Sequence, residues 1–155
     1  MKPKNSPAAW GAILAIALAV GSSPAFADGE TLSAGGLTFY LGVVPAEIVQ
    51  GHPPEHPERK MHGGEPRGRS MYHVMGAIFD AKTGQRVTDA AVRARVEEVG
   101  VTNEQKALEP MVIAGTVTYG NYFRMAGRGA FRIGVEVRRP GETRATTVQF
   151  MHQNR

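Results

Sequence analysis

Short runs of alternating hydrophobic and polar residues recur along this chain, and a period of two residues predicts β-strands. The clearest run covers residues 131–138, where Phe, Ile and Val alternate with Arg, Gly and Glu. Residues 37–44 are rich in aromatic and β-branched side chains and stop at Pro45, which predicts a first strand there. A last strand is predicted over residues 146–152.

The middle of the chain continues this pattern. Residues 91–99 alternate Val and Ala with Arg and Glu, which favours a half-buried strand, although a short helix beginning at Thr88 is the alternative. We expect residues 28–36 to be a flexible lead-in and residues 100–109 to be a connecting loop. About seven short strands joined by Gly and Pro turns predict an all-β fold, an immunoglobulin-like antiparallel β-sandwich formed by residues 37–155.

The most strand-like run, residues 70–80, also carries the densest metal-binding chemistry. Alternate side chains of a strand share a face, so Met71, His73 and Met75 should lie together. Both faces of this strand are largely apolar, which predicts a central position in the sandwich. The alternative is that these side chains only pack, because Met fills irregular gaps in cores.

The first 27 residues have the three parts of a secretory signal peptide. Lys2 and Lys4 precede an apolar run over residues 8–20, and Ala25 and Ala27 form an A-x-A cleavage site. We therefore expect an exported, periplasmic protein with no membrane span in the mature chain. Loss of the two lysines brings the formal charge of +4 closer to neutral, which does not favour a nucleic-acid partner.

Residues 50–69 form a long segment rich in His, Pro and Gly, in which the prolines and glycines exclude regular structure. Its spacing His52-x-x-Glu55-His56 matches an inverted zinc-protease motif, but that motif requires a helix, which Pro53 and Pro57 prevent. Histidine and methionine on flexible backbone can still capture a metal ion. The alternative is a polar loop that binds nothing specific. Four residues of this loop are candidate accessory ligands: His52, His56, Met61 and His62.

No catalytic arrangement stands out, since the chain has neither a nucleophile elbow nor a phosphate-binding glycine loop, and we expect a non-enzyme. Without cysteine there is also no thiolate ligand. Thioether and imidazole suit Cu(I), whereas imidazole with carboxylate also suits Cu(II), iron or zinc. The expected metal ligands are Met71, His73 and Met75, joined by Met125 or Glu47 from neighbouring strands.

The motif E-P-M at residues 109–111, followed by Y-G-x-x-x-x-M at residues 119–125, resembles the periplasmic iron-transport proteins that accompany bacterial iron permeases. More loosely, the chain is similar to small periplasmic copper-binding sandwich proteins. The resemblance covers roughly residues 37–140. It implies a sandwich that binds copper and iron through His, Met and Glu and forms a homodimer.

The same resemblance implies that Glu47, His73 and Met125 are metal ligands. It departs at Thr118, where that family has a histidine before Tyr-Gly. The site is then either weaker, or His152 or a loop histidine replaces the missing ligand.

Two functions follow from these observations. The first is an exported metallochaperone that binds copper, or as second choice iron, and delivers it to an envelope protein or permease. The second is a non-catalytic accessory module of an envelope complex whose histidines are incidental.

Overall fold

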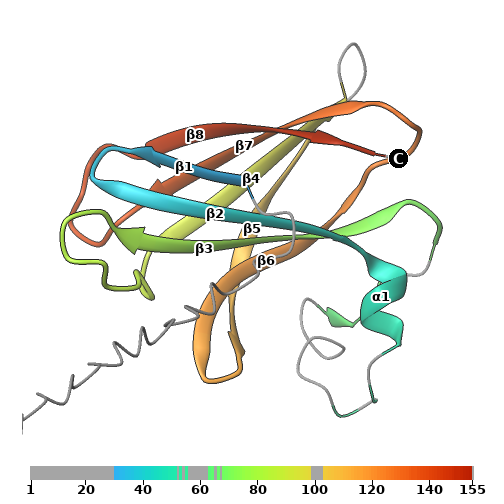
Figure 1. The fold of residues 1–155 in the computed structure, drawn as a ribbon, viewed down its shortest axis with the longest axis horizontal. Coiled ribbons are helices and arrows are strands. Elements are labelled where there is room, and N and C mark those ends of the chain that lie inside the picture. Colours follow the sequence, from blue (N-terminus) through green and yellow to red (C-terminus); the bar gives the residue numbers. More distant parts are fainter. Residues whose placement is uncertain are drawn as a thin grey trace, which may run out of the picture.

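A computed structural model describes residues 30–51, 53, 55, 63–64, 66, 68–98 and 103–154. It contains one short helix, α1 (Ala46–Gln50), and is otherwise built of strands (Figure 1). The strands are β1 (Glu30–Ala34), β2 (Leu37–Pro45), β3 (Met71–Asp80), β4 (Ala91–Glu98), β5 (Asn103–Ile113), β6 (Thr116–Arg124), β7 (Ala130–Arg138) and β8 (Thr146–Gln153).

All strand pairs are antiparallel and follow the order β1-β2-β3-β6-β5-β4-β7-β8. The long strand β5 belongs to both layers, because its first half pairs with β4 and its second half, from Glu109, pairs with β6. The strands at the two ends of the order, β1 and β8, also contact each other, so the two layers nearly close into a barrel (Figure 1). The predicted all-β antiparallel sandwich is confirmed.

The main core lies between the two layers. Strands of both layers contribute alternate side chains to it, as a sandwich requires. Its largest fully buried members include Phe39, Ile78, Phe123, Phe131 and Phe150.

A second, smaller group of buried residues lies outside this core, on the other face of the layer formed by β2, β3, β6 and β5. It consists of Ala46, Val49, His73, Met111 and Tyr122. Helix α1 packs against β2 and β3 and buries Ala46 and Val49. The sequence predicted that both faces of β3 are largely apolar. One face contributes Val74 and Ile78 to the main core, and the other contributes His73 to this second group.

Two details of the predicted layout are wrong. Residues 30–34, expected in the flexible lead-in, form β1, which pairs with β2. Strand β5 begins at Asn103 rather than after the expected loop 100–109. The strand predicted over residues 91–99 is confirmed as β4, which begins at Ala91, and the alternative helix from Thr88 does not form. Both missed strand segments are polar and carry no run of large apolar residues, so their sequences lack the alternation that marks a strand.

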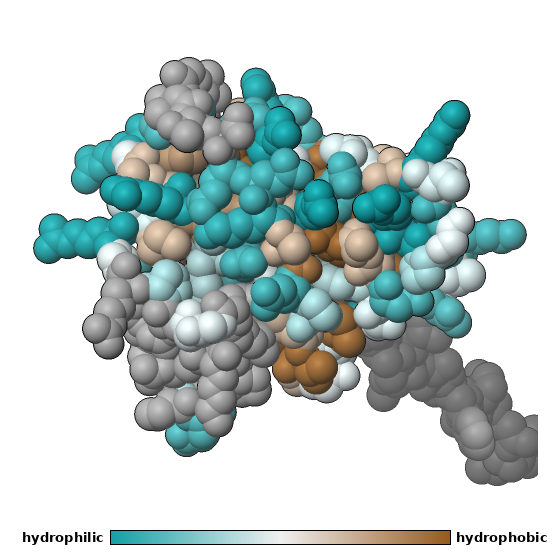
Figure 2. Space-filling model, turned by 180° about the vertical axis from the view of Figure 1, so that it is seen from behind, coloured by the Kyte–Doolittle hydropathy of each residue, from teal (hydrophilic) through white to brown (hydrophobic). Residues whose placement is uncertain are grey.

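Residues 1–27, where the sequence predicts a signal peptide, and most of residues 50–69, where it predicts a loop, lie outside the described residues. Within the part that is described, no helix has the length and apolar character needed to cross a membrane. The surface in Figure 2 is mostly hydrophilic, with apolar side chains in small groups. Among the described residues, the large apolar side chains that are exposed come from five different elements: Leu32, Tyr40, Ile48, Val112 and Met151.

Candidate metal centre

His73 is fully buried in the outer group, with none of its surface exposed to solvent. It lies on β3 directly opposite Tyr122 of β6, and the two rings are stacked with their centroids 4.7 Å apart and their planes inclined by 26°. Val44 of β2 lies opposite His73 on its other side. The imidazole is therefore flanked on the face of the sheet by the residues opposite it on both neighbouring strands, Tyr122 and Val44.

Gly120 of β6 has no side chain, and Nε2 of His73 lies close to the place that a side chain there would occupy. A Cβ atom at Gly120 would lie 2.8 Å from Nε2 of His73, 3.1 Å from Sδ of Met111 and 2.6 Å from Cε of Met111. The imidazole nitrogen and the thioether sulfur thus converge on one small space above a residue that has no side chain. A glycine inside a strand often marks such a close approach.

A tight hairpin turn brings Met111 to this position. Ala114 and Gly115 connect β5 to β6 with φ values of 48° and 76°, and positive φ at both central residues is typical of a two-residue hairpin turn. The resulting register places Met111 opposite Thr118 and Glu109 opposite Gly120. Thr118, where the sequence resemblance implies a histidine, therefore lies on the same face as Met111 and His73.

Met75 supplies a second thioether beside this space. It is half-buried and lies opposite Gly120 on one side and Gly42 of β2 on the other. Its Cε is 3.7 Å from the position of a Cβ at Gly42, so the side chain leans toward β2. Met71, two residues before His73, is half-buried and lies opposite Arg124 at the end of the β3–β6 pair. The predicted common face of Met71, His73 and Met75 is present.

The structure does not bring Met125 or Glu47 to His73. Met125 is fully buried in the main core, on the opposite face of the layer, with Phe123. Glu47 is exposed on α1, whereas Ala46 and Val49 of the same helix are buried. A turn of helix after Pro45, which the sequence analysis did not predict, turns Glu47 away from the sheet.

His152 also lies apart from this centre. Its ring contacts Tyr72, which points to the opposite face of β3 from its neighbour His73. The buried side chain of Asn154 donates from Nδ2 to the carbonyl oxygen of Met125 at 2.9 Å. Its Oδ1 therefore accepts a hydrogen bond from Nε2 of His152 at 3.2 Å. The predicted loop ligands His52, His56, Met61 and His62 lie outside the described residues.

The donors around Gly120 fit a soft metal ion. The imidazole of His73 and the thioether of Met111 border the point above Gly120, and Met75 lies on β3 opposite Gly120; imidazole and thioether donors suit Cu(I). Among the residues that the structure describes, no three side chains of His, Asp or Glu gather closely enough to hold a metal ion. A metal site built from the described residues around His73 would therefore include sulfur donors.

Sequence reasoning missed three residues of this centre: Met111, Gly120 and Tyr122. All three lie within or close to the E-P-M and Y-G motifs that carried the family resemblance. The sequence shows the spacing of these motifs, but it does not show that β6 pairs with β3, and this pairing brings the three residues to His73.

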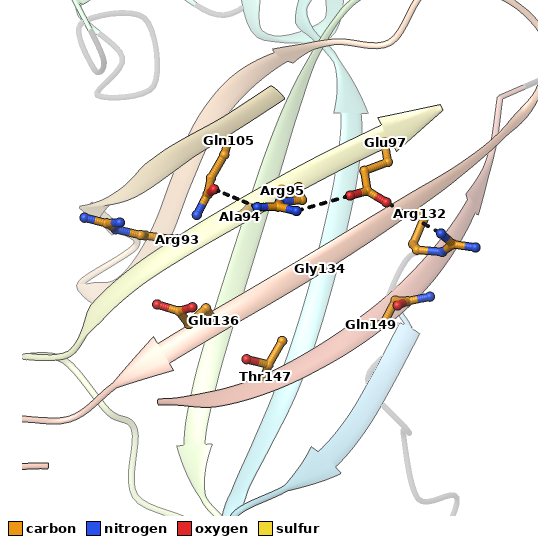
Figure 3. A pocket seen from close by; sticks show the side chains of 10 residues that line it. All are labelled: Arg93, Ala94, Arg95, Glu97, Gln105, Arg132, Gly134, Glu136, Thr147 and Gln149. Carbon is orange, nitrogen blue, oxygen red and sulfur yellow. Dashed lines mark hydrogen bonds and ion pairs between the residues drawn. The ribbon is translucent and has the colours of Figure 1, made fainter. Parts of the chain in front are cut away.

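A hollow of about 280 Å³ lies on the outer face of the other layer (Figure 3). Gly134 of β7 lines the hollow and has no side chain to fill it. Beside it, Glu97 forms ion pairs with Arg95 at 3.6 Å and with Arg132 at 3.5 Å. Neither a thioether nor an imidazole lines it. The pair with Arg95 lies within β4 and the pair with Arg132 joins β4 to β7, as on a solvated sheet face, so the candidate metal centre is the group of residues around Gly120.

No protein-family model matches the chain, and no curated protein sequence matches it. Several solved structures share its fold. A DUF4426 family protein from Pseudomonas aeruginosa is 16% identical with a TM-score of 0.64, and the match covers 81% of this chain and 94% of that one. A copper-bound variant of Campylobacter jejuni P19 is 14% identical with a TM-score of 0.62, over 81% and 94% of the two chains.

A copper-bound variant of FetP from uropathogenic Escherichia coli strain F11 is likewise 14% identical, with a TM-score of 0.60 over 81% and 93% of the chains. At these identities the likeness shows a common fold. It confirms the resemblance found in the sequence at the level of the fold.

Proposed function

We propose that this chain is an exported, non-catalytic protein that binds copper at the space above Gly120 and passes it on. The observation that carries this proposal is the convergence of His73 Nε2 and Met111 Sδ on one point, about 3 Å from each. Both side chains are buried and come from different strands, and the missing side chain of Gly120 lets their donor atoms approach the same point.

The donor chemistry favours copper over the alternatives. Thioethers are soft ligands that select Cu(I), whereas iron and zinc sites draw more on imidazole and carboxylate. Iron remains the second choice. The copper-bound state of two structural neighbours supports the same assignment.

The placement of the donors supports binding followed by transfer. His73 and Met111 are buried, while Met75 and Met71 are half-buried along the same strand face. The proposed path runs from the His52 to His62 loop, through the accessible thioethers, to the buried pair. A metal-accepting envelope protein or permease would be the recipient in the periplasm.

Titration with Cu(I) against a chromophoric chelator tests the proposal. The parent protein should bind one Cu(I) tightly, and His73→Phe should not, because phenylalanine keeps a flat ring against Tyr122 but has no nitrogen. Circular dichroism of the variant checks that it is folded. Weak binding of several ions by both proteins would favour the accessory-module function.

A further inference from the structure

Glu109 occupies a special position in the layer that carries the proposed copper site. It lies on β5 directly opposite Gly120 of β6, and Gly120 lies directly opposite Met75 of β3. Residues that face each other in antiparallel strands project from the same side of the sheet. Glu109 and Met75 therefore flank the space above Gly120.

Met111 confirms on which side Glu109 projects. The two residues are two positions apart on β5, so they share a face, and the sulfur of Met111 lies over Gly120. Directly opposed Cβ positions are about 4.5–5.5 Å apart. A glutamate side chain is long enough to cross that distance, so its carboxylate can turn toward the point that His73 and Met111 border.

Exposure separates Glu109 from the other donors. His73 and Met111 are buried, whereas Glu109 is exposed to solvent. The centre thus has an imidazole and a thioether on its buried side and a carboxyl group on its solvent side.

We infer that Glu109 is a ligand for Cu(II) at this centre, so that the protein holds copper in either oxidation state. This inference rests on the proposed copper function. Cu(I) is satisfied by imidazole and thioether, whereas Cu(II) favours nitrogen and oxygen donors. A carboxylate that engages only the divalent ion adds Cu(II) affinity and leaves Cu(I) binding to His73 and the methionines.

The test compares Glu109→Gln with the parent, using Cu(I) and Cu(II) separately, each against a competing chelator. Glutamine keeps the length of the side chain but removes its charge. Cu(II) affinity should fall about ten-fold or more while Cu(I) affinity stays within about three-fold. A ten-fold change in Cu(II) affinity alone raises the one-electron copper potential by about 59 mV. The Cu(II) electron paramagnetic resonance spectrum should also change.

Glu136→Gln is the matched control, because Glu136 is on the outer face of the other layer, opposite Arg93. It should bind both ions like the parent. Equal losses of Cu(I) and Cu(II) affinity in Glu109→Gln, or no loss of Cu(II) affinity, would overturn the inference alone, provided that the parent binds Cu(I). A parent that binds neither ion overturns the proposed function and this inference with it.

Discussion

A Cβ atom at Gly120 would lie 2.8 Å from Nε2 of His73, so the missing side chain of one residue makes room for the ring of the other. The two residues come from neighbouring strands, β6 and β3, in the same layer. Gly120 does not have the positive φ that would require glycine for backbone reasons. Its role in the centre is therefore the space that it leaves.

Gly120→Ala should close this space. The new methyl group would press against His73, which is held by its stack on Tyr122, and against the flexible end of Met111. We expect Cu(I) affinity to fall about ten-fold or more, equivalent to about 1.4 kcal/mol, measured by chelator competition. The free energy of unfolding should change by less than about 2 kcal/mol, because overpacking is partly offset by the loss of glycine flexibility.

Gly134→Ala is the control for this substitution. Gly134 also lies inside a strand, but a Cβ there would have its nearest neighbour, the carbonyl oxygen of Arg95, at 4.0 Å. It should leave copper binding unchanged. Parental Cu(I) affinity in Gly120→Ala would mean that the ion does not bind above Gly120.

The face of β3 could be predicted from sequence because it depends only on the two-residue period within one strand. Met71, His73 and Met75 lie together as the alternation predicts. The partners from other strands depend on pairing, which is decided by contacts far apart in the chain. Met111 lies 38 positions from His73 and reaches it through the β5–β6 turn and the β6–β3 pairing.

Met125 shows a second limit. It was expected beside His73 because it ends the Y-G-x-x-x-x-M motif, yet Gly120 and Met125 are an odd number of positions apart. In an extended strand an odd spacing places two residues on opposite faces, and Met125 accordingly lies in the main core. The motif alone did not say on which face a metal would bind.

The histidines of the loop provide another prediction. Replacing His52, His56 and His62 together by Ala should slow or weaken copper loading if the loop captures the ion before the strand site. The melting temperature of the metal-free protein should hardly change, since surface-loop substitutions usually cost less than about 0.5 kcal/mol. Stopped-flow loading and thermal unfolding measure the two effects. A large loss of stability would show that the loop is packed against the domain.

Asp80 at the end of β3 makes stability depend on acid pH. Its Oδ1 accepts hydrogen bonds from the backbone N–H of Thr83 at 2.8 Å and from that of Lys82 at 3.1 Å. The bonds from Thr83, with help from the Arg139 guanidinium, lower the pKa of Asp80 below its ordinary 3.8. A lowered folded-state pKa stabilises the protein above the unfolded value, and this contribution is lost as pH falls through the folded value.

Asp80→Asn should therefore unfold at a lower temperature than the parent at neutral pH. The difference should shrink once the pH drops below 3.8 and vanish below the folded-state pKa of Asp80, where the parent has lost its charge too. Thermal unfolding followed by circular dichroism from neutral pH to about pH 2 measures it. A difference that stays constant over this range would mean that the charge of Asp80 contributes nothing.

Two buried methionines allow the thioether hypothesis to be tested with matched substitutions. Met111 is 2% exposed and borders the space above Gly120, whereas Met125 is 0% exposed and lies in the main core. Leucine has a similar volume to methionine but no sulfur. Met111→Leu and Met125→Leu should each cost less than about 1.5 kcal/mol of unfolding free energy, measured by urea denaturation.

The two variants should differ in copper binding. Met111→Leu should lower Cu(I) affinity about ten-fold or more, because a soft donor is lost, while Met125→Leu should bind Cu(I) like the parent. Chelator competition at equal protein concentration compares them. If both variants keep the parental affinity, the sulfur of Met111 only packs against its neighbours and is not a ligand of the ion. If both lose affinity equally, the effect comes from the stability of the sandwich, since Met125 lies on the face opposite His73.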